Sequence, residues 1–325
     1  MASTETQRHT AALDADAAGR MIARGGVVAF PTETVYGLGA DATDPAAVAR
    51  IFAAKGRPAH NPLIVHVADL ASAERLAVLD GEARLLASRF WPGPLTLVAP
   101  LRDGHGLAPA VTAGLPTVAL RVPAAPLAQA VLRAAGVPVA APSANPSGRV
   151  SATTAAHVVE GLGGRIDVVL DGGPCPVGVE STIVALAPPR ILREGGLATE
   201  AIEAVLNRSL GRDLSPDRIG APGQLASHYA PSRPLRLGVC DSLADGVLLG
   251  FGPVAGEISL SATGSVDEAA RRLFAALREA DRMAAARNAA FIDVAPIPET
   301  GLGRAVNDRL RRAAAPRPGT PHAGS

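Results

Sequence analysis

The chain has 325 residues, which favours two domains or one large one, and its net charge of +1 does not indicate the strongly basic face of a non-specific nucleic-acid binder. Its two cysteines do not make a disulfide scaffold or a cysteine metal cluster, and no apolar run reaches the roughly 18 residues of a membrane helix. Because the first residues also lack the layout of a signal peptide, we expect a cytoplasmic protein.

Strands and helices alternate along the first part of the chain. A helix is predicted over 11–24 and a short apolar strand over 27–30. Asp44, which is followed by Pro45, is predicted to cap the N-terminus of a helix that continues to Lys55. Further strands are predicted over 63–67, 95–101, 117–122, 137–141, 167–171, 181–186 and 190–193, and further helices over 69–90, 124–135 and 152–162. This alternation favours an α/β fold.

Residues 211–234 contain four prolines and little apolar periodicity, which predicts a linker. Beyond the linker, strands are predicted over 235–239, 247–251, 257–260 and 289–294, and helices over 266–287 and 302–314. The sequence therefore predicts a larger α/β domain over 11–210, a smaller one over 235–315, and a tail over 316–325.

Two familiar signatures do not apply. The phosphate-binding motif G-x-x-x-x-G-K-[ST] does not occur. GFGPVA over 250–255 matches the residue pattern of a dinucleotide-binding fingerprint, but Pro253 and the predicted strand that follows favour a plain turn. His60 and His66 lack cysteine or carboxylate partners at metal-ligand spacing. No protein metal site is therefore predicted.

The stretch IFAAKGRPAHNPLIVHV, residues 51–67, holds Lys55, the only lysine among 31 basic residues. Lys55 and Arg57 flank the glycine that ends a predicted helix, so their side chains could converge on one anion such as a phosphate chain. A solvated helix end is the alternative, because the helix dipole favours basic residues in the last turn. The residues alone leave both interpretations open.

A second polar stretch, APSANPSGRVS over 141–151, leaves the end of a predicted strand. Ligands bind at the carboxyl ends of strands in open α/β sheets, and Ser143, Asn145, Ser147 and Ser151 offer uncharged polar groups there. We expect Asn145 to be exposed. An ordinary turn is the alternative interpretation, because proline, serine, asparagine and glycine are common turn residues.

Two further stretches, FPTETVYGLGAD over 30–41 and GVESTIV over 178–184, place polar side chains beside predicted strands. The only two tyrosines are Tyr36, in the first of these stretches, and Tyr229, in the linker. Both tyrosines fall in segments predicted as loops, where a tyrosine is less commonly part of the hydrophobic core.

The stretches PTETVYGLGADA, KGRPAHNPLIVHV, WPGPLTLV, PSANPSG and GVESTIV occur in the order found in the YrdC family, which the chain resembles over nearly all of residues 11–315. HYAP in the linker and IPETGLGRAVNDRLRRAA near the end resemble the longer, two-domain form. The resemblance implies a twisted open mixed sheet with helices, followed by a smaller Rossmann-like α/β domain. It also implies that the linker covers the cleft of the first domain as a lid.

The activity that the resemblance implies is that of an L-threonylcarbamoyladenylate synthase, a nucleotidyltransferase. Such an enzyme joins L-threonine, bicarbonate and ATP into threonylcarbamoyl-AMP and releases pyrophosphate, with Mg²⁺ bound largely through the phosphates. Its product passes to a separate threonylcarbamoyl transferase that acts on tRNA. Neither a membrane nor direct tRNA binding is then required.

The resemblance also assigns site residues. The family signature K-x-R…S-x-N falls on Lys55, Arg57, Ser143 and Asn145, of which Lys55 and Arg57 are the expected catalytic residues. Threonine-side contacts fall on Thr34, His66, Arg121, the backbone of Ala141, and Ser181. ATP-side contacts fall on Arg57, Asn61, Thr117, Ser143, Asn145, Ser151, Arg193 and Tyr229.

This chemistry needs no side-chain nucleophile, because a carbamate oxygen attacks the α-phosphorus of ATP and the protein only positions and neutralises charge. Two other interpretations remain open: a non-catalytic RNA-binding module and a carbamoyl-transfer maturation factor. The latter carries zinc-finger modules, for which two cysteines are too few.

Overall fold

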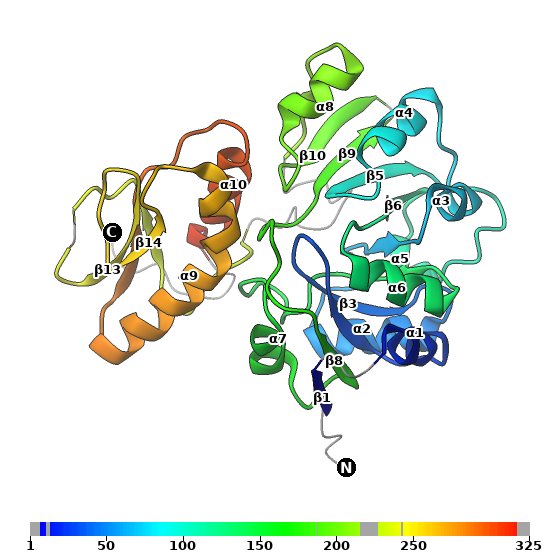
Figure 1. Ribbon diagram of the computed structural model, residues 1–325, viewed down its shortest axis with the longest axis horizontal. Helices are drawn as coiled ribbons and strands as arrows, with labels where there is room; N and C mark the ends of the chain where they lie inside the picture. Colours follow the sequence, from blue (N-terminus) through cyan, green and yellow to red (C-terminus); the bar gives the residue numbers. More distant parts are fainter. Residues whose placement is uncertain (1–6, 11–13, 187, 215–226, 242, 317–325) are drawn as a thin grey trace. The chain divides into compact units, whose positions relative to one another are not determined.

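The computed structural model describes residues 7–10, 14–186, 188–214, 227–241 and 243–316 (Figure 1). The chain divides into two compact units, of which the first comprises Met1–Ser147 and Ser151–Gln224 and the second comprises Gly148–Val150 and Leu225–Ser325. Residues 11–13 of the first predicted helix, 215–226 of the predicted linker and 317–325 of the tail lie outside the described residues.

A mixed sheet organises the first unit, and its eleven described strands follow the order β1-β8-β2-β3-β7-β4-β6-β5-β9-β10-β11. The strands are β1 (Gln7–Thr10), β2 (Val28–Pro31), β3 (Tyr36–Asp41), β4 (Ile64–His66), β5 (Leu95–Pro100), β6 (Thr117–Arg121), β7 (Val139–Ala140), β8 (Val168–Asp171), β9 (Thr182–Leu186), β10 (Pro189–Arg193) and β11 (Gly211–Arg212). β4 and β6 run parallel, whereas β7 is antiparallel to both of its neighbours, β3 and β4. This open mixed sheet confirms the predicted fold class.

The described helices of the first unit are α1 (Ala15–Ala23), α2 (Pro45–Lys55), α3 (Leu70–Leu76), α4 (Gly81–Phe90), α5 (Pro109–Thr112), α6 (Pro126–Ala135), α7 (Ala155–Leu162) and α8 (Thr199–Leu206). Local sequence fixes both ends of α2. The Asp44 carboxylate accepts a 2.8 Å hydrogen bond from the Ala46 N–H, and proline follows at the first helical position. Gly56 takes the left-handed conformation, with φ of +60°, and so ends the helix directly after Lys55.

Two predictions for this unit were wrong in detail. The single helix predicted over 69–90 is two helices, because Ala77 pairs with Leu101 in an isolated bridge and Asp80 caps a new helix. Residues 36–41, predicted as a loop, form the buried strand β3 between β2 and β7. The glycines of β3 obscure its strand pattern, and at Gly39 a side chain would come within 2.6 Å of the Phe30 ring.

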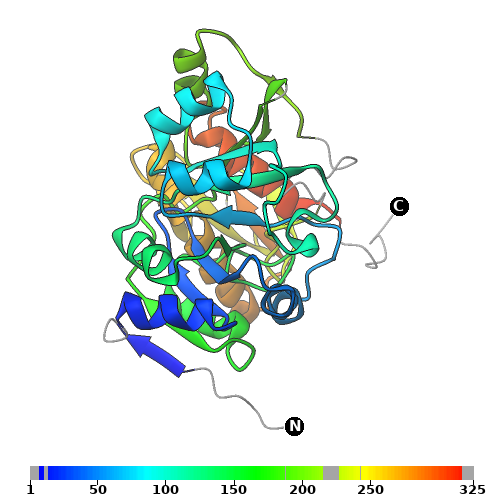
Figure 2. The same cartoon turned by 90° about the vertical axis from the view of Figure 1, so that its right-hand side faces the viewer.

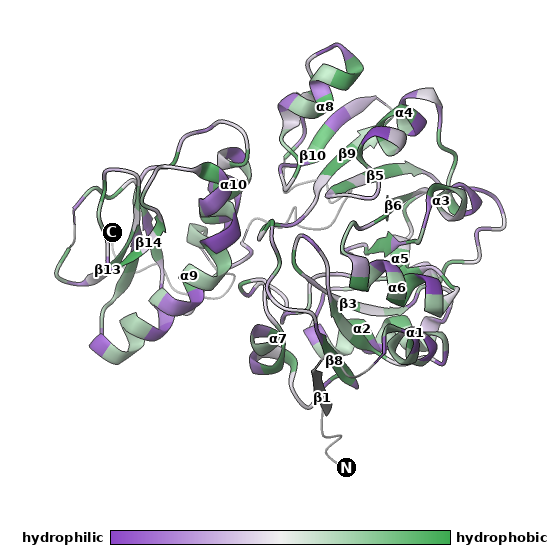
Figure 3. Cartoon of the chain, viewed as in Figure 1, coloured by the Kyte–Doolittle hydropathy of each residue, from purple (hydrophilic) through white to green (hydrophobic). Residues whose placement is uncertain are grey.

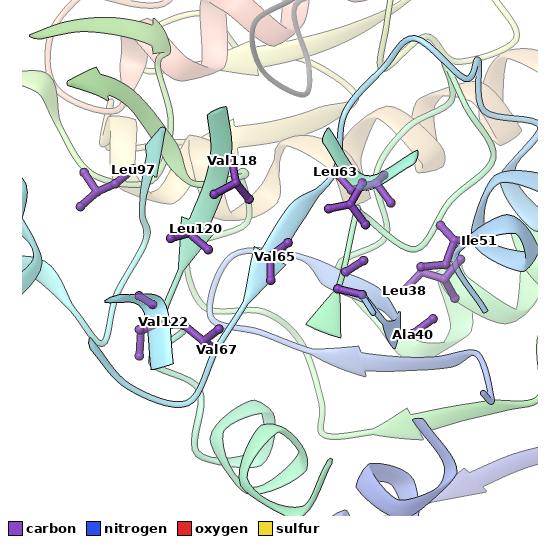
Figure 4. Close-up of a cluster of buried hydrophobic side chains, with 14 of the residues drawn as sticks. Leu38, Ala40, Ile51, Leu63, Val65, Val67, Leu97, Val118, Leu120 and Val122 are labelled. Atoms are coloured by element: carbon purple, nitrogen blue, oxygen red, sulfur yellow. The ribbon is translucent and has the colours of Figure 1, made fainter. Parts of the chain in front are cut away.

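Strand alternation divides the core of the first unit between the two faces of the sheet. In β2, Ala29 belongs to one buried cluster, whereas Val28 and Phe30 belong to another. The first cluster includes residues of α2, α3, α4, α5, α7 and α8, and Figure 4 shows Leu38 of β3 beside Ile51 of α2. The second includes residues of α1 and α6, which lie side by side on the other side of the sheet (Figures 1 and 2).

A third cluster of the first unit contains strand residues only. Its members are Ile64, Val98, Ala119, Ile183, Ala185 and Leu192, from β4, β5, β6, β9 and β10. Unlike the two larger clusters of this unit, it has no helix residue among its members. We call this side of β4, β6, β5 and β9 the strand-only face.

The second unit is a smaller α/β domain, as the sequence predicts. Its described strands, β12 (Leu235–Leu237), β13 (Gly246–Phe251), β14 (Ile258–Ser261) and β15 (Phe291–Val294), pair in parallel in the order β12-β15-β13-β14. Its helices are α9 (Val266–Arg287) and α10 (Gly303–Ala314). The bands of green and purple along α9 in Figure 3 show its apolar and charged faces. Neither α9 nor any other described helix combines the length and hydropathy of a membrane-spanning segment.

Candidate active site

His66 and Arg121 lie together on the strand-only face. Side chains alternate along a strand, and Val65 belongs to the helix-covered core, so His66 points to the other side of β4, with Ile64. The same alternation places Arg121 with Ala119 on β6. His66 and Arg121 are register partners in the parallel pair of β4 and β6. Both were predicted on the threonine side.

The other residues of this group border the same face. The N–H of Ala141 donates a 2.9 Å hydrogen bond to the Ile64 carbonyl, so Ala141 lies at the start of β4. Ser181 directly precedes β9, and its hydroxyl lies 2.7 Å from that of Thr96 in β5. Thr34 is fully buried in the connection between β2 and β3 and shares a 2.8 Å hydrogen bond with the hydroxyl of Thr32.

Arg121 forms a buried ion pair that no sequence motif predicts. Its Nη2 donates a 2.7 Å hydrogen bond to Oε1 of Glu33, and its Nε donates one of 3.2 Å to the Gly93 carbonyl. Arginine at the end of an interior strand needs such an acceptor, because an unpaired buried charge is strongly destabilising. A search for a carboxylate among the predicted polar loops could have found Glu33, since it stands next to Thr34.

His66 is an uncharged and only partly satisfied side chain. Burial, and next the charge of Arg121, lower the pKa of His66 from 6.5 to about 3, so the imidazole is neutral at physiological pH. Its Nδ1 has no hydrogen-bond partner among the described residues although it is buried. Buried polar atoms nearly always have a partner, so an orphan such as this one indicates a missing ligand or water.

Lys55 is buried, although it ends a helix. Its Nζ donates hydrogen bonds of 2.5 and 2.6 Å to the carbonyl oxygens of Ser143 and Asn145, and its own carbonyl accepts one from the Ser147 N–H. Burial, and next the charge of Arg57, hold the pKa of Lys55 well below its usual value, while the Glu180 carboxylate acts in the opposite direction. The solvated helix end is thereby excluded for Lys55.

Arg57 and Asn61 form a compact turn after α2. Arg57 donates from Nη2 to the side-chain oxygen of Asn61 at 2.7 Å and to the Pro62 carbonyl at 2.7 Å. Asn61 is fully buried, and its Nδ2 lacks a partner among the described residues. The predicted ATP side therefore also contains an orphan donor.

The loop over 142–151 differs from the prediction in two respects. Asn145 is fully buried, not exposed, and its Nδ2 donates a 2.8 Å hydrogen bond to the Pro146 carbonyl. The preceding strand β7 is antiparallel to its neighbours, so the loop lies beside the start of β3, where Ser143 pairs with Gly37. The rule for carboxyl ends of parallel strands therefore does not explain its position. Lys55 holds the loop instead.

Ser151 and Arg193 meet the segment that precedes β9. The Ser151 hydroxyl donates a 2.5 Å hydrogen bond to Oε1 of Glu180, and Arg193 donates from Nη2 to the Ser181 hydroxyl at 3.1 Å. Because Glu180 also acts on Lys55, these contacts join the predicted threonine and ATP sides through the 180–181 segment. Sequence reasoning assigns no role to Glu180, although the residue lies in the GVESTIV stretch.

Three remaining residues stand apart. Thr117 begins β6 two residues before Ala119, so the two side chains share the strand-only face, but Thr117 is only half-buried. Tyr36 is fully buried in β3, contrary to the predicted loop, and its hydroxyl donates a 2.8 Å hydrogen bond to the Gly173 carbonyl. Tyr229 belongs to the second unit, where its ring stacks on Phe274 with centroids 5.6 Å apart.

The donor set of this site suits anions better than a bare metal ion. The described residues contain no group of three or more histidine, cysteine or acidic side chains that could hold a metal. Magnesium that arrives with ATP is bound largely through phosphate oxygens and does not need such a group.

This fold and site define an α/β protein that can bind small charged ligands on an open sheet. A family model named for the Sua5, YciO and YrdC proteins, with the description "Telomere recombination", matches residues 20–195. A second, described as the C-terminal domain of threonylcarbamoyl-AMP synthase, matches residues 197–315. The chain belongs to the Sua5/YciO/YrdC family, in its two-domain form.

Relatives of this form are similar over both units. Threonylcarbamoyl-AMP synthase of Bacillus subtilis (strain 168) is 42% identical over 315 residues, which cover 89% of this chain and 89% of the relative. That of Pyrococcus abyssi (strain GE5 / Orsay) is 44% identical and covers 90% of this chain and 91% of the relative. The crystal structure of P. abyssi Sua5 complexed with L-threonine has a TM-score of 0.86 at 40% identity, and covers 94% of this chain and 96% of that one.

Proposed function

We propose that this chain is a threonylcarbamoyl-AMP synthase, a nucleotidyltransferase that joins L-threonine, bicarbonate and ATP. The observation that carries the proposal is the similarity of both units to relatives of that name, over 89% and 90% of the chain. The site geometry supports it, because His66 and Asn61 each hold one of the buried polar atoms that lack a hydrogen-bond partner among the described residues. One is a predicted threonine-side residue and the other a predicted ATP-side residue.

The proposed reaction balances in two steps. The amine of threonine and bicarbonate give an N-carboxylate and water. An oxygen of this carbamate attacks the α-phosphorus of ATP, a new P–O bond forms, and the bond to the β-phosphate oxygen breaks. Pyrophosphate leaves with that electron pair, and threonylcarbamoyl-AMP remains. Both reactants are anions, so the protein must hold them together and offset their repulsion.

The threonine subsite of the proposal consists of Thr34, His66, Arg121, Ala141 and Ser181. Arg121 binds the carboxylate of threonine, because guanidinium and carboxylate match in charge and geometry. The neutral imidazole of His66 offers its Nδ1 to a polar group of the same substrate without adding a charge. The backbone of Ala141 and the hydroxyls of Thr34 and Ser181 complete the subsite.

The ATP subsite of the proposal is built around Lys55 and Arg57, the proposed catalytic residues. Two N–H groups of the Lys55 ammonium bind loop carbonyls, which leaves the third for a phosphate oxygen. Mg²⁺ enters with ATP and neutralises charge on the phosphates. The remaining residues proposed for this subsite are Asn61, Thr117, Ser143, Asn145, Ser151, Arg193 and Tyr229.

The proposal extends to the surroundings of the reaction. The mixed anhydride product hydrolyses in water, so it passes to a transferase that modifies tRNA, and this chain itself has no need to bind tRNA. Its substrates are metabolites of the cytoplasm, where we place the protein. The domain limits 11–210 and 235–315, with a linker over 211–234, belong to the same proposal.

Pyrophosphate release is the test. Purified protein with MgATP should release pyrophosphate only when L-threonine and bicarbonate are both present, and mass spectrometry should detect threonylcarbamoyl-AMP. Equal release without threonine would contradict the proposal. Tight RNA binding without any turnover would favour the non-catalytic RNA-binding alternative instead.

A further inference from the structure

The connection between β2 and β3 is a tight turn that holds two side chains in fixed positions. The Thr32 hydroxyl closes it by donating a 2.6 Å hydrogen bond to the Val35 carbonyl and accepting from the N–H groups of Thr34 and Val35 at 3.2 and 3.3 Å. Glu33 and Thr34 therefore occupy the two central positions of the turn. The carbonyls of these two residues accept hydrogen bonds from Val177 and Gly178, which fixes the turn further.

The Glu33 carboxylate uses both of its oxygens within the protein. Oε1 accepts from Arg121 at 2.7 Å, and Oε2 accepts from the N–H of Ala124 at 3.0 Å and that of Ala125 at 3.4 Å. Glu33 is 7% exposed and Arg121 is 3% exposed, so water solvates neither charge appreciably. Such a carboxylate is aligned by the backbone and in turn aligns the guanidinium.

The same contacts leave one end of Arg121 available. Glu33 and the Gly93 carbonyl engage Nη2 and Nε, whereas Nη1 has no hydrogen-bond partner among the described residues. A guanidinium is planar, so two fixed nitrogens determine the direction of the third. Nη1 is thus presented in one direction from a buried strand end.

We propose that Glu33 is the positioning residue of the threonine subsite: it orients Arg121 toward the substrate carboxylate and balances its charge, so that the subsite accepts a zwitterionic amino acid in preference to a simple anion. The inference rests on the proposed function. With Glu33 in place, the pair is neutral and His66 adds no charge, so a ligand of no net charge is matched best. Without the carboxylate, the positive charge of Arg121 is unbalanced and attracts any small anion.

Glu33→Gln tests both parts of this proposal, since it keeps the shape and one oxygen but removes the charge. Calorimetry without ATP should show L-threonine binding weakened by about 10- to 100-fold, the range seen when the hydrogen-bond partner of a metal-ligating side chain is removed. Sodium sulfate at constant ionic strength should compete with threonine in this variant and not in the wild-type chain. The KM for ATP should stay within about twofold, since that subsite is untouched.

Asp167→Asn is a matched control. Asp167 likewise joins an arginine to a backbone amide, with hydrogen bonds of 2.6 Å from Arg50 and 2.7 Å from the Val27 N–H. Neither Asp167 nor Arg50 belongs to a proposed subsite. This variant should lose stability but bind threonine normally and stay insensitive to sulfate.

Glu33→Asp provides a second arm if the glutamine variant does not fold. It retains the charge but shortens the side chain, so we expect weaker threonine binding without sulfate competition. Unchanged threonine affinity in both Glu33 variants, or equal losses in Asp167→Asn, would overturn the proposal. A wild-type chain that binds threonine but releases no pyrophosphate would contradict the proposed function alone, and one that binds no threonine would contradict both.

Discussion

Lys55 is the residue whose environment says most about this protein. It is the single lysine among 31 basic residues, and it places its Nζ between the carbonyls of Ser143 and Asn145, at 2.5 and 2.6 Å. Only 3% of it is exposed. A compact ammonium fits such a buried position, whereas a guanidinium is larger and planar and holds its donors in a fixed fork.

We therefore expect Lys55→Arg to lower kcat by about 10²–10³-fold, the usual cost of losing one preorganised charge contact. The measurement is pyrophosphate release at saturating threonine, bicarbonate and MgATP. Arg165→Lys is the control, because Arg165 also donates to two main-chain carbonyls, those of Ala54 and Gly161, but is exposed. A Lys55→Arg variant within about threefold of wild type would show that the position needs only a positive charge.

His66 should make the first unit sensitive to acid. Its pKa is about 3 when folded and 6.5 when unfolded, so below pH 6.5 the unfolded chain binds a proton that the folded chain does not. The stabilisation is present above pH 6.5 and is lost as pH falls toward 3, by about 1.4 kcal/mol per pH unit. Urea unfolding of wild type and His66→Gln between those limits should show a shallower slope for the variant. Identical slopes would mean that His66 titrates normally.

At the scale of elements, the end of α2 connects local structure to the site. Gly56 adopts φ of +60°, and a Cβ at this position would have no neighbouring atom within 4 Å, so its only requirement is conformational. Lys55 and Arg57 stand on either side of it. The geometry of one glycine therefore sets the direction of two proposed catalytic side chains.

Gly56→Ala should cost about 1 kcal/mol of unfolding free energy, because the left-handed conformation is strained for alanine. Misplacement of Lys55 and Arg57 should also lower kcat by about 10- to 100-fold. Gly81→Ala is the matched control: Gly81 begins α4, has equal space and lacks a positive φ, so alanine should be neutral or slightly stabilising. Thermal unfolding and pyrophosphate release of both variants test whether the positive φ of Gly56 is the cause. Equal behaviour of the two alanine variants would contradict the conformational explanation.

At the scale of the whole molecule, the loop that Lys55 holds is divided between the two units. Gly148–Val150 belongs to the second unit, where the Gly148 carbonyl accepts a 2.9 Å hydrogen bond from the Ala230 N–H and the Val150 carbonyl accepts one of 2.7 Å from Arg278. These contacts lie within the second unit, which therefore includes three residues of a loop proposed for ATP binding.

A chain truncated after Leu214 should fold but lose most synthesis. The cut must follow residue 214, because β11 pairs with β10 and Asp213 forms an ion pair with Arg190 at 3.3 Å. Circular dichroism should show a cooperative transition for the fragment, and pyrophosphate release should fall at least about tenfold, because the fragment lacks Tyr229, which is proposed for the ATP subsite. Full activity of the fragment would show that the second unit is dispensable for the reaction.

The sequence alone determined much of this protein, because the decisive signals are local or ordered along the chain. Apolar periodicity and capping residues such as Asp44 and Gly56 predicted most helices and strands, since these signals depend on near neighbours. The ordered stretches around Lys55 and Ser143 predicted the family. The strand β3 was missed because its glycines serve packing against Phe30, a contact that lies outside any local window.

Only the tertiary structure decided which charges meet. Glu33 and Arg121 are 88 residues apart, as are Lys55 and Ser143, and no local pattern pairs them. The direction of β7, and hence the edge at which its loop lies, is a property of the sheet and not of the strand's own sequence. The burial of Asn145 follows from that arrangement as well, because the packing of distant segments, unlike helix propensity, determines what water can reach.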